Sequence, residues 1–344
     1  IFDYAYDACV VINSNSGFID NVLVDSCFIL RSSMRKFDPL SNSGGPDSVA
    51  TTYKPVRGRD CTLRDTVIAY CGGEGASAAK GSRNTTIEGC VIYDCYHWHL
   101  GNQRGQGAIL RNNFVFHTGR KAFLQKDKAG NLQLPDGLII GDEGSSESFG
   151  PGNTPSIYNN IFVNFKFCFW LRAGGNYKTR MNGAYLGYNT FVWLEDPQAT
   201  KAIKIEPGLY GAHYNNLFEN NIVYAPSGKI FDGSSTGFSF RNNAYRALPP
   251  SAIRGDNDQI ESAANPSAMV NPTKIPESTF TFSLDMTSPA LITAMPTLTQ
   301  LRAMAERYRI ADSGTACIGK ASDGSSVSAG GYTITPPTTP QDED

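Results

Sequence analysis

Four short segments of the sequence carry basic and aromatic side chains at alternate positions: 96–100, 121–125, 168–172 and 202–206. If each segment is a strand, alternation places one set of side chains outside, away from the aliphatic set. That outer set is His97, His99, Lys121, Phe123, Trp170, Arg172, Lys204 and Glu206. Cations bind carboxylates and flat rings stack on sugars, so the predicted surface suits an acidic polysaccharide. The alternative is an ordinary sheet face that a loop covers.

The chemistry that fits such a surface is β-elimination from a uronic acid. It needs a base near the sugar C5 proton and a cation that neutralises the uronate carboxylate. The catalytic candidates are His97, His99, Lys121, Arg172 and Lys204. The substrate-binding candidates are Phe123, Trp170 and Glu206, followed by Lys178 and Arg180 in the loop 174–180. Hydrolysis would need two facing carboxylates, and outward acidic pairs are scarce in these segments.

A Gly/Ser-rich loop offers a candidate metal site, with Asp142, Glu143 and Glu147. Hard oxygen ligands on a flexible backbone are what Ca²⁺ prefers. A solvated loop without metal is the competing interpretation. No cofactor other than calcium is expected.

The elements that must position these residues belong to a repeat. Segments of one shape centre on positions separated by 39, 24, 23, 47, 29, 32 and 22 residues, namely Cys27, Thr66, Cys90, Asn113, Asn160, Asn189, Asn221 and Asn243. The positions three before and two after each centre are apolar in all eight segments. Directly before the centre, six of the eight residues are Gly, Asn or Asp, which tolerate left-handed backbone angles. Each unit is therefore predicted to be a strand, a sharp bend and a second strand.

Such a coil is a solenoid whose successive turns pair in parallel, about 4.8 Å apart. One inward column is predicted to be structural, because stacked amides can bond to the turns above and below: Asn113, Asn160, Asn189, Asn221 and Asn243. An outer column alternates in sign and is expected to form weak charge pairs between turns: Asp25, Arg64, Glu88 and Arg111, then Glu219 and Arg241.

Several motifs carry a resemblance to a known superfamily. The repeated R-N-N-F and Y-N-N-I-F units, and the stretches NP, TFSL and SPALI between 265 and 292, are similar to the right-handed parallel β-helix, or pectate-lyase-like, superfamily of secreted and surface proteins. The resemblance covers about residues 1–295 and implies an all-β fold, a single-stranded right-handed parallel β-helix. The superfamily contains lyases, hydrolases, phage tailspikes and adhesins, so the fold alone does not define the reaction.

The chain is expected to divide into three parts. Residues 1–295 form the β-helix, with loop insertions at 33–59 and 126–156. Residues 296–320 form a C-terminal helix that covers an open coil end or braces the side, because apolar residues there recur with a helical period. Residues 321–344 are a Pro/Thr-rich, low-complexity tail or linker. The N-terminus shows no matching cap, which predicts upstream sequence or self-association through the coil ends.

Two cysteines lie five residues after their centres, in turns that should be adjacent: Cys71 and Cys95. Stacked positions about 4.8 Å apart fall within the Cα range of a disulfide. A Cys71–Cys95 disulfide is therefore predicted, with two buried free thiols as the alternative.

Composition restricts the class of partner. The chain has 344 residues, of which 18% are charged, and its net charge of −2 gives no general attraction to nucleic acid or anionic membranes. No apolar run approaches the roughly 20 residues that span a bilayer, and eight cysteines fit an oxidising compartment. We expect a secreted, cell-surface or virion-surface protein that acts on polysaccharide, as a lyase. A non-catalytic adhesin or tailspike-like module, and a subunit of an extracellular filament, are the alternatives.

Overall fold

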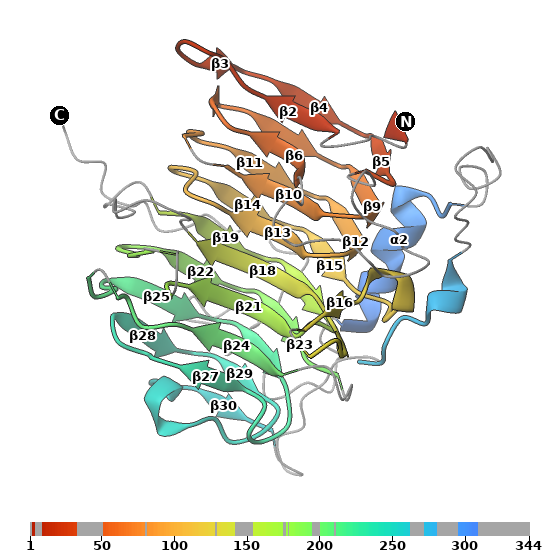
Figure 1. The fold of residues 1–344 in the computed structure, drawn as a ribbon. Coiled ribbons are helices and arrows are strands. Elements are labelled where there is room, and N and C mark those ends of the chain that lie inside the picture. Colours follow the sequence, from red (N-terminus) through yellow and green to blue (C-terminus); the bar gives the residue numbers. More distant parts are fainter. Residues whose placement is uncertain are drawn as a thin grey trace.

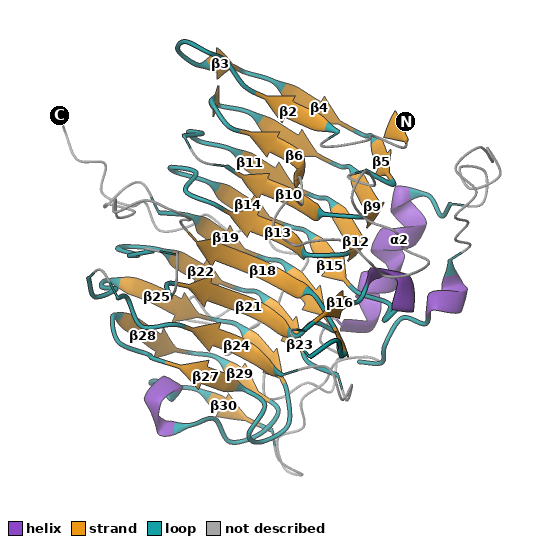
Figure 2. Cartoon of the chain, viewed as in Figure 1, coloured by secondary structure: helices purple, strands orange, loops and turns teal. Residues whose placement is uncertain are grey.

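The computed structural model describes residues 2–3, 9–32, 51–79, 81–127, 129–141, 154–174, 177, 179–194, 200–209, 211–261, 272–280 and 295–308. These residues form a coil in which three parallel sheets run along its length (Figures 1 and 2). Each complete turn contributes one strand to each sheet. The predicted parallel β-helix is confirmed.

The first sheet has ten strands and follows the sharp bend of each turn; we call it the ten-stranded sheet. Its strands in spatial order are β1 (Phe2–Asp3), β5 (Phe28–Leu30), β9 (Val67–Cys71), β12 (Val91–Cys95), β15 (Phe114–Phe116), β20 (Ile161–Val163), β23 (Thr190–Val192), β26 (Ile222–Tyr224), β29 (Ala244–Tyr245) and β30 (Gln259–Ile260).

The second sheet comes next along each turn; we call it the β13 sheet. Its strands are β2 (Val10–Ile12), β6 (Thr51–Pro55), β10 (Glu74–Ala78), β13 (Trp98–Asn102), β18 (Asp136–Gly141), β21 (Phe167–Arg172), β24 (Lys201–Ile205) and β27 (Phe231–Gly233).

The third sheet precedes the bend; we call it the β14 sheet. Its strands are β4 (Leu23–Asp25), β8 (Thr62–Arg64), β11 (Thr86–Glu88), β14 (Ile109–Arg111), β19 (Ser156–Tyr158), β22 (Tyr185–Gly187), β25 (Asn216–Glu219) and β28 (Phe238–Arg241). Two small pairs complete the strands, β3 (Ile19–Asp20) with β7 (Gly58–Arg59) and β16 (Gln125–Lys126) with β17 (Leu132–Gln133).

The predicted insertions are shorter than expected. Strands β6 and β7 lie inside 33–59, and β18 lies inside 126–156. The reason is that both segments return to the coil before the next bend, where their backbones pair with neighbouring turns. Residues 33–50 and 142–153 lie outside the described part of the chain.

The residue directly before each repeat centre adopts the left-handed bend that the sequence predicts. All eight bend residues have φ between 50 and 63°: Ser26, Asp65, Gly89, Asn112, Asn159, Tyr188, Asn220 and Asn242. A tyrosine rarely adopts this left-handed conformation, so at Tyr188 the surrounding coil imposes the bend.

The asparagine column forms the predicted ladder. The Asn113 Nδ2 atom donates to the Oδ1 of Asn160 at 2.9 Å, and the Oδ1 of Asn113 accepts from the Cys90 amide at 2.9 Å. The same pattern continues through Asn189, Asn221 and Asn243, so the amides are satisfied inside the core.

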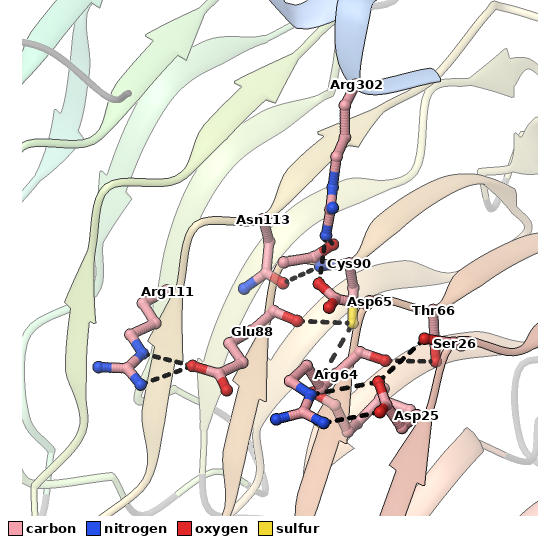
Figure 3. Close-up of polar contacts among 12 residues, drawn as sticks. Asp25, Ser26, Arg64, Asp65, Thr66, Glu88, Cys90, Arg111, Asn113 and Arg302 are labelled. Atoms are coloured by element: carbon pink, nitrogen blue, oxygen red, sulfur yellow. Dashed lines mark hydrogen bonds and ion pairs between the residues drawn. The ribbon is translucent and has the colours of Figure 1, made fainter. Parts of the chain in front are cut away.

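The outer charged column forms the predicted pairs, drawn in Figure 3 for the first turns. Arg64 pairs with Asp25 at 2.6 Å, and Arg111 pairs with Glu88 at 2.6 Å. These pairs lie on the exposed side of the β14 sheet, where each contributes little stability.

The C-terminal helix α2 (Leu298–Ala305) lies along the outer side of the ten-stranded sheet (Figure 1), so it is a brace and not an end cover. Leu301 is fully buried against this sheet, and Arg302 bonds to Asp65 and to the Gly89 carbonyl (Figure 3). The short helices are η2 (Lys121–Phe123), η3 (Ser251–Ile253), η4 (Glu277–Thr279) and η5 (Glu306–Tyr308). Within the described residues, no helix is long and apolar enough to cross a membrane.

The predicted disulfide is not formed. Cys71 and Cys95 are paired in register between β9 and β12, as expected, but both are free thiols. Each sulfur instead donates to a carbonyl of its own strand, Ala69 or Tyr93. The two thiols are fully buried in adjacent strands, and each is satisfied by a carbonyl of its own strand, which is the alternative of two buried free thiols.

Candidate functional site

The outward side of the β13 sheet gathers the chemistry-bearing side chains; we call it the outer face. Its inward side is aliphatic and aromatic, with Leu100, Leu138, Phe169 and Ile203 in the core. One outward row runs across five neighbouring strands, because the register aligns the first residue of each: Glu74, Trp98, Asp136, Phe167 and Lys201.

Two carboxylates of this row flank a histidine. The His97 Nδ1 atom lies 3.6 Å from Glu74 Oε1, and the imidazole packs on the Trp98 ring at 4.0 Å between centroids. The backbone amide of Asp136 donates to the His97 carbonyl at 3.2 Å, so the acid and the imidazole stand on adjacent strands. Thr51 donates to the second oxygen of Glu74 and fixes that carboxylate. We call Glu74, His97, Trp98 and Asp136 the acidic cluster.

Three enclosed polar atoms of the acidic cluster have no hydrogen-bond partner among the residues that the structure describes: Asp136 Oδ1, Trp98 Nε1 and His97 Nδ1. Buried polar atoms are nearly always bonded, and leaving one unbonded costs about 1–3 kcal/mol. A concentration of such atoms on one face indicates a place where a hydroxyl-rich ligand can supply donors and acceptors.

The Asp136 carboxyl is tuned for proton transfer. Burial raises its pKa from 3.8 to about 6, against the opposing effect of the cations Lys166, Arg172 and Lys204 and of the nearby His97 side chain. A group with a pKa near the working pH exchanges protons readily, as a general acid must.

A second group of side chains lies on the same face, at the end of β21 and in the loop that follows it. The Arg172 guanidinium stacks between Trp170, at 4.9 Å from the ring centroid, and Tyr177, at 3.8 Å, and it donates to the Tyr177 hydroxyl at 2.9 Å. Within the described part of the chain, no carboxylate forms an ion pair with Arg172. Its charge is therefore available to a ligand anion.

Glu206 has a different role from the substrate contact expected for it. It accepts from Trp170 Nε1 at 3.1 Å and from the backbone amides of Ala173 and Gly174 at 3.0 and 2.7 Å. These bonds hold the indole and the loop in position, so Glu206 organises the group. Lys204 lies 3.5 Å from the same carboxylate.

A shallow pocket of about 340 Å³ opens beside these residues, lined by Trp170, Arg172, Gly174, Glu206, Pro207 and Leu209. Leu209 is 63% exposed at its rim. The Lys204 ammonium lies 5.0 Å from the Phe167 ring and 5.1 Å from the Trp170 ring. Lys204 therefore lies beside Trp170 and Glu206 of this pocket, which we call the Arg172 pocket, and its charge also acts on Asp136 of the acidic cluster.

The structure brings five of the predicted outward residues to one face: His97, Trp170, Arg172, Lys204 and Glu206. The other three predicted outward residues lie elsewhere.

His99 is wrong as an outward residue. It is completely buried, its ring lies 4.7 Å from Phe165, and its Nε2 accepts from the Cys95 amide at 3.0 Å. The register places it beside Gly75 and Gly137, and a side chain at 137 would meet the Phe165 ring against which the imidazole packs inside the coil. Burial holds the pKa of His99 well below its usual range, so the ring is neutral.

Lys121 and Phe123 are also misplaced, because 121–125 is not the strand of this turn. Those residues form η2, and β18 supplies the strand instead. Phe123 is fully buried in the hydrophobic cluster on the outer side of the ten-stranded sheet, with its ring centroid 5.9 Å from that of Tyr70. Lys121, in the same short helix, is exposed.

The remaining candidates lie apart or outside the described residues. Arg180 stacks on Tyr214 at 5.1 Å and does not line the Arg172 pocket. Lys178 and the calcium candidates lie outside the described residues: Asp142, Glu143 and Glu147. Among the residues that are described, no group of three or more His, Cys, Asp or Glu side chains could hold a metal ion.

Sequence reasoning missed Glu74 and Asp136. The signal for Glu74 was present, since it stands 24 residues before Trp98, the same distance that separates Cys71 from Cys95. Asp136 follows Trp98 by 38 residues because a loop intervenes, and this spacing hides it from a search by period.

Comparisons with known proteins give similarity at the level of structure. No family profile and no curated protein matches the sequence. The chain is similar to XylC in complex with xylose, at 14% identity and a TM-score of 0.47, over 74% of this chain and 40% of that one.

It is also similar to a double mutant of the tailspike protein of E. coli bacteriophage HK620, at 13% identity and a TM-score of 0.47, over 74% of this chain and 50% of that one. The chain thus spans half or less of the length of these two structures. The roles of individual residues have to come from the outer face itself. The three stacked, in-register parallel sheets of the coil make the chain a parallel β-helix protein.

Proposed function

We propose that the outer face binds an acidic polysaccharide and that the protein cleaves this polymer by β-elimination, as a polysaccharide lyase outside the cell. The observation that carries the proposal is Arg172, a guanidinium held between two aromatic rings with no acidic partner among the described residues. An oriented guanidinium is suited to a carboxylate or sulfate, and the adjacent indole of Trp170 offers a stacking surface for a sugar ring.

A polymer with regularly spaced anions needs several cations in a row. Lys166 directly precedes β21, Arg172 ends it, and Lys204 on the neighbouring β24 is in register with Trp170; all three act on the Asp136 carboxyl. Phe167 and Trp170 stand between these charges. The alternation of cations with rings supports a ligand in which carboxylates and sugar rings also alternate.

β-Elimination needs a cation on the uronate carboxylate and a base for the C5 proton. The outer face supplies both kinds of group close together, with the cations near His97 and Asp136. A non-catalytic binding role is the second candidate, because Glu74 and Asp136 are only 5% and 4% exposed.

The test is a panel of alginate, pectate, hyaluronan and chondroitin sulfate, with dextran as the neutral control. Cleavage is followed by the ultraviolet absorbance of the new C4=C5 double bond, and binding by isothermal titration calorimetry. We expect an absorbance increase with at least one acidic polymer and none with dextran. Binding without an absorbance increase would establish the second candidate, and absence of both would refute the proposal.

Arg172→Gln is expected to weaken binding of the acidic polymer by about 10- to 100-fold, the effect of losing a charge-assisted bond. Arg246→Gln is the matched control, because Arg246 also stacks on a tyrosine ring, at 4.5 Å from Tyr224, but beside the ten-stranded sheet. Equal weakening by both substitutions would mean that only net charge matters, and would contradict a site at Arg172.

A further inference from the structure

We infer that the acidic cluster is the acid–base centre of this site: Asp136 donates a proton to the leaving oxygen, and His97, oriented by Glu74, removes the C5 proton. This inference rests on the proposed function and names the residues that perform it. The cluster lies on β10, β13 and β18, whereas the binding determinants above lie on β21 and β24.

The first argument is the placement of the acid and the base. Asp136 and His97 are joined through the backbone, with the Asp136 amide donating to the His97 carbonyl at 3.2 Å. Neighbouring strands are about 4.8 Å apart. In the polymer, C5 and the leaving oxygen are both attached to C4, so the two groups must act within one sugar ring. Adjacent strands provide that separation.

The second argument is the state of the histidine. Its Nδ1 atom is enclosed and faces Glu74 at 3.6 Å. A carboxylate on this side favours the tautomer with a proton on Nδ1, which leaves a lone pair on Nε2. Glu74 is itself fixed by the bond from Thr51. Glu74 is therefore a positioning residue, and Nε2 is the base.

The third argument is that two buried polar atoms of the acidic cluster lack hydrogen-bond partners. Asp136 Oδ1 and Trp98 Nε1 are both enclosed and have no hydrogen-bond partner in the described part of the chain, and Asp136 is more than nine-tenths buried. A protein gains nothing from an unpaired carboxyl at such a position unless a ligand completes it. A leaving oxygen that accepts from the Asp136 carboxyl, and a sugar hydroxyl that accepts from the Trp98 indole, would satisfy these two atoms.

The step balances without a further reactant. His97 Nε2 takes the C5 proton, and the C5–H electron pair becomes the C4=C5 double bond. The C4–O4 bond then breaks, and O4 takes the proton of the Asp136 carboxyl. The products are an unsaturated uronate end and a free hydroxyl, and proton exchange with water restores both side chains.

The experiment compares Asp136→Asn, His97→Gln and Glu74→Gln with the control Asp232→Asn, using the panel polymer that the wild type cleaves best. Asp232 is an exposed carboxylate in register with Lys204, at the far end of the same sheet. We expect Asp136→Asn and His97→Gln to lower kcat/KM by about 100-fold or more, the usual contribution of a general acid or base. Polymer affinity should change by less than about 3-fold, because neither side chain contributes mainly to ground-state binding.

Glu74→Gln is expected to reduce kcat while moving the pH optimum, because the tautomer of His97 loses its charged partner. Asp232→Asn should leave kcat/KM unchanged. Thermal unfolding of each variant shows whether it is folded, and Asp136→Glu provides a second variant that keeps an acid in place and should retain part of the activity.

The outcomes separate the two proposals. If the wild type cleaves and Asp136→Asn retains its rate, the acid–base assignment is wrong and the lyase function stands. If the wild type binds the polymer without cleaving it, the assignment is also wrong, and only the binding role of the outer face remains. If neither binding nor cleavage occurs on the panel, the proposed function fails and the assignment fails with it.

Discussion

Replacement of Asn113 by leucine tests the asparagine ladder, because this residue is bonded on both sides. Its Oδ1 accepts from the Cys90 amide at 2.9 Å, and its Nδ2 donates to the Ile87 carbonyl at 2.9 Å. Leucine has a similar volume but no polar atom. The substitution therefore removes the partners of two buried backbone groups and leaves little cavity behind.

The magnitude follows from those two groups. Each buried donor or acceptor that loses its partner costs about 1–3 kcal/mol. Asn160 Oδ1 still accepts from the Asn113 backbone amide at 3.0 Å, so it is not left unsatisfied. Asn113→Leu should therefore lower the free energy of unfolding by about 2–6 kcal/mol.

The assay is urea unfolding followed by circular dichroism, with Asn112→Gly as the control. Asn112 is the preceding residue, is exposed, and has a φ of 58°, which glycine adopts without strain. We expect the control to change stability by less than about 1 kcal/mol. Polymer binding should be unchanged in both folded variants. Equal effects of the two substitutions, or a loss of binding by Asn113→Leu at unchanged stability, would refute the ladder as the reason for this column.

Four further results are expected. Asp136→Asn should stabilise the protein at pH 7.5 but not at pH 4, by at most about 3 kcal/mol in urea unfolding. The pKa of Asp136 is about 6 in the folded protein and 3.8 ordinarily, so folding takes up a proton at pH values between the two. Above pH 6 the ionised carboxylate destabilises the native state, and asparagine removes this cost. Leu301→Ala should cost about 2–5 kcal/mol and expose α2 to limited proteolysis, because Leu301 is fully buried against the ten-stranded sheet. Glu88→Gln should cost less than about 1 kcal/mol at low salt and nothing measurable at high salt, because its pair with Arg111 lies at the surface. Phe123→Ala should cost about 3–5 kcal/mol without weakening polymer binding, which would separate this core ring from the outer face.

The coil was predictable from the sequence because its determinants repeat. Bend residues such as Gly89 and Asn112 need a positive φ, and inward residues such as Leu110 and Val115 need burial, in every turn alike. A requirement that recurs at a fixed position is visible in one sequence, whether or not loops of different lengths separate the turns.

The outer face was only partly predictable, because strict alternation fails where a strand enters from a corner. His99 and Leu100 are consecutive, as are Cys168 and Phe169, yet all four side chains are buried in the coil. Further along β21 the alternation returns, and Arg172 points outward as expected.

The acidic cluster joins segments that are far apart in the sequence, so no short sequence motif predicts it. Asp136 stands beside Trp98 only because β18 returns to the sheet after η2 and the β16–β17 hairpin. The burial that raises its pKa is likewise a property of the assembled face, as are the lysine and arginine charges from neighbouring segments that oppose the rise.

The asparagine ladder also gives the solenoid an electrical direction. From Asn113 to Asn243, the side-chain amides form one hydrogen-bonded row in which each Nδ2 donates to the side-chain oxygen of the next turn, besides its bond to a backbone carbonyl of the turn before. Aligned amide dipoles reinforce one another, as they do along an α-helix. The donor end therefore favours an anion, and there the Asn243 side-chain amide donates to Asp258 Oδ1 at 3.4 Å, while its backbone amide donates to the same oxygen at 2.8 Å. Burial raises the pKa of Asp258, and the hydrogen bonds from Asn243 oppose this rise, so the end of the row partly offsets the cost of the buried charge.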